Sequence, residues 1–319
     1  MLQSFLHRAA FAVAAVVGLA PFSLQAEDDI TYLSPDNPDV VAVVQVADFL
    51  ASPAFQELLK QLPDVKQKLA EPLGKKTKLT PLDIKSVYIA GNTSGEKEVS
   101  VVVTTTKNME VTDLLVGDDA KAEMIGDYEL YVHDDSGISQ IDKNQFVMGP
   151  PETVRKILKR DDDPTRSKLL EAAWEEVDEE EQLYVVTELG ALMKKAGAAL
   201  PPGFPLTPDT LAKLNTAMVH ANADEKVSVA VDVTCADAAT ATQIKALADL
   251  LIGTQVNNPN SPPPVQELLK ALKSSVDGET ISVKMELTAE ATMGLVQMLV
   301  PRGAPAPGEA PAPPAPAPK

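Results

Sequence analysis

The chain has 319 residues, of which 46 are Asp or Glu and 28 are Lys or Arg, so its formal net charge at neutral pH is −18. A surface this acidic repels the phosphates of nucleic acids and of anionic lipids, which excludes both as expected partners. The single cysteine, Cys235, cannot form an intrachain disulfide, so stability has to come from an apolar core in which Cys235 is expected to be a small buried residue.

Residues 1–26 have the pattern of a secretory signal peptide. A short basic segment ends at Arg8, an apolar run follows from Ala9 to Leu24, and Ala26 is a small residue at a cleavage position. The run is interrupted by Pro21 and is short for a membrane-spanning helix, which needs about 20 apolar residues. We therefore expect an exported protein, periplasmic or extracellular in a bacterium, with no membrane span in the mature chain. Retention of the segment as an N-terminal anchor is the alternative.

Two blocks of the sequence resemble each other. In the first, Leu79-Thr80-Pro81 precedes a strand-like run ending at Asn92, and Val99–Val103 follows. In the second, Leu206-Thr207-Pro208 precedes a run ending at Asn222, and the valine-rich 227–231 follows. Such repetition is typical of a duplicated folding unit.

The repeat divides the chain into four parts. Residues 27–163 are expected to form a first α+β module and residues 164–301 a second, joined at the acidic, Pro-containing segment around 161–164. Residues 302–319 are almost entirely Pro and Ala and are expected to be a disordered tail.

Period-two alternation predicts the strands, most clearly at 227–234 and 281–288. Alternation places one set of side chains in the core and the other toward water, which is typical of antiparallel sheets. The more uniformly apolar runs 40–46 and 99–103 predict central strands or strands covered on both faces. The predicted strands are Val40–Ala47, Ile84–Asn92, Val99–Thr105, Tyr128–His133, Ile138–Ile141, Gln145–Gly149, Leu183–Glu188, Leu214–Asn222, Lys226–Thr234 and Thr280–Leu287.

Apolar residues at helical spacing predict the helices between these strands. Ser52-Pro53 and Ser261-Pro262 each place a capping hydroxyl before a proline that suits a first helical position. Further helices are predicted at Asn108–Val116, Pro151–Arg160, Thr165–Val177, Ala236–Ile252 and Ala289–Val300. Since each helix has one apolar stripe, we expect an α+β fold of two tandem repeats, each an antiparallel sheet covered by helices on one face. Whether the two sheets join is left open.

One stretch resembles a known group of proteins. Pro38–Val44 followed by Phe49-Leu50-Ala51-Ser52-Pro53-Ala54-Phe55 leads a strand through a leucine–small–Ser-Pro–x–Phe pattern into a helix. It is similar to uncharacterised exported bacterial proteins built from a duplicated α+β module, a family of unknown function. The resemblance implies this fold and brings no catalytic residues or cofactor.

His133, Asp134 and Asp135 form the polar cluster most suggestive of chemistry, because a His beside two carboxylates can bind a divalent metal or act as a general base. The following Ser-Gly, however, makes the segment typical of a hairpin turn, which we favour. The other His of the mature chain, His220, aligns with Ala90 in the repeat and not with His133. No cofactor is expected.

The sequence has no nucleophile elbow and no glycine-rich phosphate loop, and its 4% aromatic content disfavours sites that stack sugars or nucleobases. We therefore expect a non-enzymatic binding or structural protein whose unknown protein or small-molecule ligand lies between the modules. Two alternatives are left open. One is a carrier of an apolar ligand, suggested by Leu192, Met193, Met293 and Met298; the other is a carboxylate- or metal-dependent enzyme.

Overall fold

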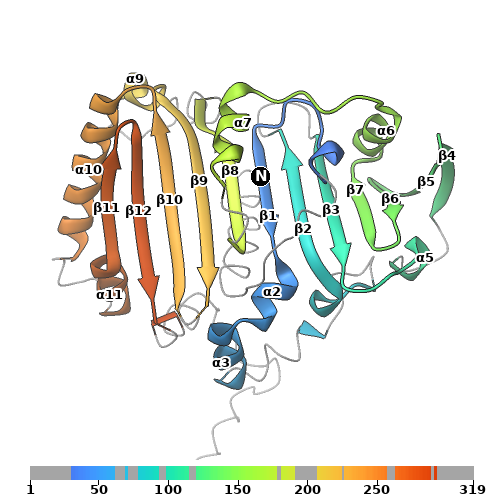
Figure 1. Ribbon diagram of the computed structural model, residues 1–319, viewed down its shortest axis with the longest axis horizontal. Coiled ribbons are helices and arrows are strands. Elements are labelled where there is room, and N and C mark those ends of the chain that lie inside the picture. The colour runs from blue at the N-terminus through green and yellow to red at the C-terminus, as the bar shows by residue number, and fades with distance from the viewer. Residues whose placement is uncertain are drawn as a thin grey trace, which may run out of the picture.

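The computed structural model describes residues 30–61, 69–70, 78–92, 98–114, 120–177, 181–190, 207–224, 226–256, 263–288 and 291–292. Their strands form one 12-stranded sheet in which every pair is antiparallel (Figure 1). The protein is therefore an α+β protein with an antiparallel sheet, as the alternation predicts.

The strands are β1 (Val40–Val44), β2 (Ile84–Gly91), β3 (Val99–Thr105), β4 (Lys121–Ile125), β5 (Tyr128–His133), β6 (Ser136–Asp142), β7 (Gln145–Gly149), β8 (Leu183–Glu188), β9 (Leu214–Ala223), β10 (Val227–Cys235), β11 (Leu272–Asp277) and β12 (Thr280–Leu287). The helical segments are η1 (Ile30–Leu33), α2 (Val46–Ala51), α3 (Pro53–Gln61), η2 (Pro81–Asp83), α5 (Val111–Leu114), α6 (Pro151–Lys159), α7 (Lys168–Glu175), α9 (Pro208–Leu211), α10 (Ala238–Val256) and α11 (Pro263–Ala271).

The two halves of the chain meet at the β1–β8 pair. These strands run antiparallel, with Val40 opposite Thr187 and Val44 opposite Leu183. Outward from the pair the order is β1-β2-β3-β7 on one side and β8-β9-β10-β12 on the other, followed by β6-β5-β4 and by β11 respectively. The sheets of the two halves are thus joined into one, and the extra strands predicted near 128–141 are present as β5 and β6.

Helices pack on both faces of the sheet. On one, here named the α6–α7 face, residues of α6 and α7 such as Val154 and Leu170 join a core cluster with Val43 and Tyr184 of the central strands. The register places the alternate residues on the opposite face, where a cluster of α5 residues packs on Val103 and Phe146, and clusters containing α10 and α11 residues pack on strands of the second half.

The prediction that helices cover a single face is therefore wrong. The first half carries α6 on one face and α5 on the other, and in the second half α7 packs on the α6–α7 face while α10 and α11 pack on the opposite one. The physical reason is that β3 and β7 carry apolar residues on both sides: Val102 and Val103 are 1% and 5% exposed, and Phe146 and Val147 are both 0% exposed. A strand that is apolar on both sides needs cover on both faces, as the runs 40–46 and 99–103 indicate in the sequence.

Several element boundaries also differ from the predictions. β4 and β11 are not predicted. β11 begins at Leu272, the last residue of an apolar stripe at helical spacing, Val265, Leu268, Leu269 and Leu272, which predicts a helix. The predicted helix Asn108–Val116 is present only as α5 among the described residues. Cys235 is 0% exposed and lies in an apolar cluster, as expected.

Side-chain caps explain where three helical segments begin. The backbone N–H of Phe55 donates to Ser52 Oγ at 3.1 Å, which confirms Ser52 as the cap before α3. Thr80-Pro81 begins η2 and Thr207-Pro208 begins α9: the N–H of Thr80 donates to Asp83 Oδ2 at 3.1 Å, and the N–H of Thr210 donates to Thr207 Oγ1 at 3.2 Å. Each of these Thr-Pro pairs therefore leads through a short helical turn into a strand, β2 or β9.

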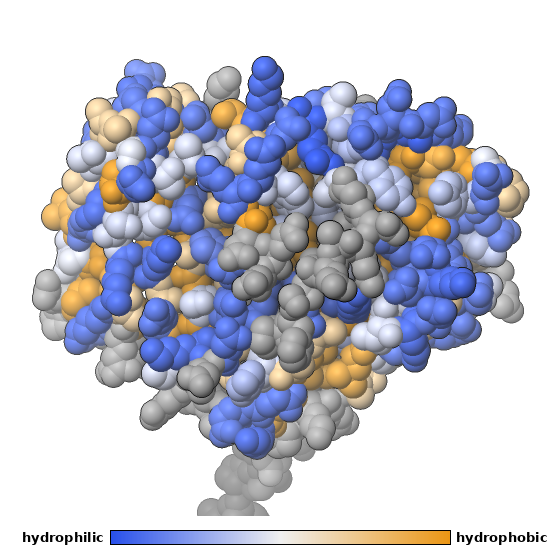
Figure 2. All heavy atoms as spheres, viewed as in Figure 1, coloured by the Kyte–Doolittle hydropathy of each residue, from blue (hydrophilic) through white to orange (hydrophobic). Residues whose placement is uncertain are grey.

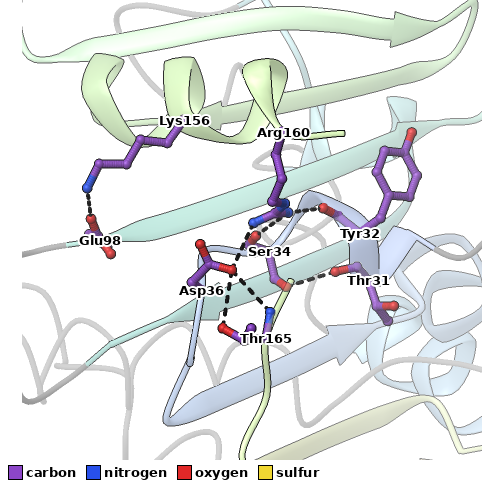
Figure 3. A network of polar contacts seen from close by, with 8 residues as sticks. All are labelled: Thr31, Tyr32, Ser34, Asp36, Glu98, Lys156, Arg160 and Thr165. Carbon is purple, nitrogen blue, oxygen red and sulfur yellow. Dashed lines mark hydrogen bonds and ion pairs between the residues drawn. The ribbon is translucent and has the colours of Figure 1, made fainter. Parts of the chain in front are cut away.

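Arg160, just after α6, connects η1 and the residues that follow it to the rest of the fold (Figure 3). Its guanidinium donates to the carbonyl of Ser34 at 2.9 Å and to the carbonyl of Tyr32, and lies 3.5 Å from Asp36 Oδ1. The same Asp36 oxygen accepts from the N–H of Thr165 at 3.1 Å. The Arg160 side chain is only 16% exposed, so these contacts tie the start of the described chain to the segment that joins the two halves.

Large hydrophobic side chains are exposed at only a few of the described positions. On the face shown in Figure 2, hydrophilic residues predominate among those coloured, and hydrophobic residues form smaller separate areas. Among the described residues the large exposed hydrophobic ones come from different parts of the chain: Tyr32, Leu82, Met124, Leu169 and Leu250. None of the helices in the described ranges is long and apolar enough to cross a membrane.

Candidate functional site

The predicted cluster at 133–135 lies at the turn between β5 and β6. His133 pairs with Ser136, so Asp134 and Asp135 form a two-residue connection, and Asp134 has a positive φ of 52°. Asp residues tolerate this left-handed conformation in turns. His133 Nδ1 lies 3.4 Å from Asp134 Oδ2, and the Asp134 side chain is 66% exposed. The geometry is that of the hairpin turn favoured by the sequence. In the residues with described positions, no group of three or more His, Cys, Asp or Glu could hold a metal ion.

A different histidine occupies a more enclosed position. His220 of β9 lies between two carboxylates: Nδ1 is 3.0 Å from Glu181 Oε1, and Nε2 is 3.0 Å from Asp232 Oδ2 on β10. Ser282 of β12 donates a hydrogen bond to the other oxygen of Asp232. We call these four residues, Glu181, His220, Asp232 and Ser282, the histidine network. It links three neighbouring strands to the segment that enters β8.

The register places the histidine network on the α6–α7 face. His220 lies opposite Tyr184, which packs in the α6–α7 core cluster, and Asp232 lies opposite both Met218 and Ser282. The side chains are half-buried, with exposures of 20% for Glu181, 21% for His220 and 16% for Asp232. Hydrogen bonds between charged groups are stronger in such partly desolvated positions than in water.

The two carboxylates favour the charged form of His220. The hydrogen bond to Glu181 raises the pKa of His220, burial lowers it, and the hydrogen bond to Asp232 raises it again, so the pKa lies above its usual value. With both ring nitrogens facing carboxylates, the imidazolium can donate on both sides, whereas neutral imidazole can donate on only one. The network is therefore most favourable when His220 is protonated.

A row of three amide side chains lies beside the histidine network. Gln45 directly follows β1, Gln182 directly precedes β8, and Asn222 is in β9, so the residues come from three adjacent strands. The N–H of Gln45 donates to the Gln182 carbonyl at 2.8 Å, and Gln182 Oε1 accepts from the N–H of Ala223 at 2.7 Å. Gln45 and Gln182 are each 1% exposed. We call Gln45, Gln182 and Asn222 the amide row.

Unpartnered polar atoms concentrate at this place. The buried side-chain atoms without a hydrogen-bond partner in the described part of the chain are Gln45 Nε2, Gln182 Nε2, Asn222 Oδ1, Glu181 Oε2, Ser100 Oγ and His133 Nδ1. The first four belong to the amide row and to Glu181, next to His220. Buried polar groups in proteins nearly always have partners, so a group of four without them needs an explanation.

The first half of the sheet has apolar residues at the positions that correspond to His220, Asp232 and Ser282. Ala90 lies opposite Val41 on β1, as His220 lies opposite Tyr184 on β8. On the next strand outward, Val102 of β3 corresponds to Asp232 of β10. On the strand after that, Val147 of β7 corresponds to Ser282 of β12. Ala90, Val102 and Val147 are 0–1% exposed and share a core cluster with α6 residues. His220, Asp232 and Ser282 therefore have apolar counterparts in the first half, whereas the amide row draws one member, Gln45, from that half.

The sequence partly anticipates these residues. The alternation at 227–234 places Asp232 on the side away from Val229 and Val231, and the similarity of the two sequence blocks aligns His220 with Ala90. In the sheet Ala90 lies on the strand next to β1 and His220 on the strand next to β8. Glu181 and Gln182 follow an acidic run with no local motif, and Gln45 stands alone after β1. No sequence pattern pairs these residues with one another or with His220, because Gln45 meets Gln182 through the β1–β8 register and Glu181 meets His220 through the β8–β9 pairing.

The comparisons with known proteins give a structural similarity. No protein-family model matches the chain, and no curated protein matches it. Crystal form I of the treponemal protein TP0453 is similar over 86% of this chain and 99% of that one, with 12% sequence identity and a TM-score of 0.45. Crystal form III is similar over 86% and 100%, with 12% identity and a TM-score of 0.47. The resemblance to exported proteins of duplicated architecture stays a prediction.

Proposed function

We propose that the chain is an exported, non-enzymatic binding protein, and that its ligand is held beside the β1–β8 pair by the amide row and Glu181. The observation that carries the proposal is the concentration of four buried polar atoms without partners in the described chain. Leaving one such atom unpaired costs about 1–3 kcal/mol. A group of them is expected where the missing partner is a molecule that the chain binds.

The expected duplication supports this location. Outward from the β1–β8 pair, the first four strands on each side follow one another in the same chain order, which is what two copies of one unit meeting at their first strands would give. On this proposal the first copy keeps an apolar core at Ala90, Val102 and Val147, and the second has gained polar residues at the equivalent places. The ligand then lies between the two modules, as expected from the sequence.

The histidine network supports binding more than catalysis. Both nitrogens of His220 are engaged by carboxylates, so neither is available to a substrate or a metal ion without breaking a contact. The residues that suggest an apolar-ligand carrier, Leu192, Met193, Met293 and Met298, lie outside the described residues. The polar binding protein is therefore the function that the geometry favours.

A ligand screen by thermal shift on the full chain tests the proposal. We expect a polar ligand to raise the melting temperature of the wild type and of the exposed-surface control Glu279→Gln, and to have little effect on Glu181→Gln, which lacks the free carboxylate oxygen. Equal shifts in all three proteins would contradict the location. Turnover in a hydrolase panel that a single substitution such as Asp232→Asn abolishes would contradict a non-enzymatic role.

A further inference from the structure

The orientation of Gln182 fixes what the amide row offers to a ligand. Because Gln182 Oε1 accepts from the N–H of Ala223, the Nε2 end of this amide is the end left free, and it is a donor. Gln45 Nε2 is a second free donor on the neighbouring strand. Two amide donors on adjacent strands are suited to the lone pairs of one carbonyl oxygen.

Glu181 and Asn222 offer the opposite chemistry. Glu181 Oε1 is taken by His220, and its second oxygen, Oε2, is buried and has no hydrogen-bond partner among the described residues. Asn222 Oδ1 is likewise without one. Both atoms are acceptors, and one carries negative charge, so together they are suited to a group with several N–H donors.

The charges around the site favour a cation over an anion. Glu181 and Asp232 supply two negative charges and His220 supplies at most one positive charge, so the histidine network has a net negative charge. The nearest lysine in the same row of the sheet is Lys284, opposite Ala230, which is itself opposite His220. Lys284 and His220 are two strand spacings apart, about 10 Å. Lys284 therefore does not pair with Glu181, which lies beyond His220.

We propose that the site binds a small ligand carrying a protonated amine beside a carbonyl group, such as the amino terminus of a peptide or an amino acid amide. The ammonium donates to Glu181 Oε2 and Asn222 Oδ1, and the carbonyl oxygen accepts from Gln45 Nε2 and Gln182 Nε2. This ligand class rests on the proposed binding function and specifies it. It gives each of the four unpaired atoms a partner of the correct polarity and adds positive charge where the protein has negative charge.

The test uses two probes that differ only in the amine: triglycine amide and its N-acetylated form. Binding to the full chain is measured by calorimetry and by backbone amide chemical shifts. We expect the wild type to bind triglycine amide at least about tenfold more tightly than the acetylated form, a difference of ~1.4 kcal/mol. In Glu181→Gln this preference should vanish, in Gln45→Met both probes should weaken together, and Glu279→Gln should match the wild type.

The outcomes separate this inference from the proposed function. If neither probe binds, but another compound from the screen binds and loses affinity in Glu181→Gln, the ligand class is wrong and the proposed function stands. If acetylation leaves the affinity unchanged, the assignment of Glu181 Oε2 to an ammonium is wrong. If no compound depends on Glu181, both fail, and a crystal structure showing only ordered water at the four atoms would agree with that result.

Discussion

Replacing His220 with leucine should destabilise the protein at pH 6 and much less at pH 9. The substitution removes two charge-assisted hydrogen bonds, each worth about 1.5–3 kcal/mol. Because the side chains are about one-fifth exposed, the lower value applies, giving ~3 kcal/mol. Burial of the leucine returns ~1 kcal/mol, so the expected net loss at pH 6 is ~2 kcal/mol.

The pH dependence follows from the direction of the pKa shift. The pKa of His220 is raised in the folded protein, chiefly by the hydrogen bond to Glu181, so its contribution is complete below the ordinary histidine pKa and is lost as the pH rises through the folded value. At pH 9 the neutral ring donates to one carboxylate only, and the difference between wild type and His220→Leu should fall to ~1 kcal/mol or less.

Urea denaturation of the wild type and of His220→Leu at pH 6 and at pH 9 measures the loss of stability at each pH. His133→Leu is the control, because His133 contacts a largely exposed Asp134 at 3.4 Å and should change stability by less than about 0.5 kcal/mol at either pH. A His220→Leu variant that is as stable as the wild type at pH 6, or that shows the same deficit at pH 6 and pH 9, would refute the doubly hydrogen-bonded imidazolium.

Three further predictions concern the fold. Arg160→Lys keeps the positive charge but loses the forked guanidinium geometry, so it should lower the free energy of unfolding by about 1.5–3 kcal/mol. It should also speed backbone hydrogen exchange at residues 32–36, and unchanged exchange there would argue against the anchoring role. Gly149→Ala should destabilise the protein by ~2 kcal/mol, because a Cβ at this position would lie 2.5 Å from the Val99 carbonyl oxygen. Gly253→Ala in α10, where a Cβ meets no atom within 4 Å, is the control and should be neutral or stabilising by up to ~1 kcal/mol. Thermal melts in which Gly149→Ala is the more stable variant would contradict the close approach of the two strands. Burial, and then the charge of Asp39, raise the pKa of Glu188, so the ionised form of Glu188 destabilises the fold. Glu188→Gln should therefore increase the free energy of unfolding by ~0.5–1 kcal/mol at pH 7. It should have no effect below about pH 4, where the carboxyl is protonated in both the folded and the unfolded chain.

The strands that alternate or are buried on both sides could be located from the sequence. β3, β7, β8 and β12 have the predicted bounds, because their apolar residues are either consecutive or strictly alternate. β4 has no such signal: of Lys121–Ile125 only Ile125 is buried, since an edge strand outside the core needs few apolar residues. The uniformly apolar runs of the first half indicate that helices cover both faces of the sheet there. They do not indicate which helix lies on which face.

The candidate site depends on contacts that no local pattern records. Asp232 was placed on the polar side of β10 by alternation, but its approach to His220 requires the β9–β10 register. Gln45 and Gln182 are brought together only because β1 and β8 pair antiparallel across the midpoint of the chain. Glu181 belongs by sequence to an acidic run, and its contact with His220 depends on where β8 begins. The hairpin turn at Asp134 and Asp135, which is entirely local, was predicted.

The pairing of β1 with β8 also bears on whether either half could exist alone. Cutting the chain between α6 and α7 would leave β1 in one fragment and β8 in the other, each with a row of unpaired backbone N–H and C=O groups. Both strands carry apolar side chains that are 0–2% exposed in the intact protein: Val41 and Val43 in β1, and Val186 in β8. Bare apolar strand edges of this kind recruit other chains. Separate fragments are therefore expected to aggregate or to reassociate with each other, and mixing them should restore one sheet.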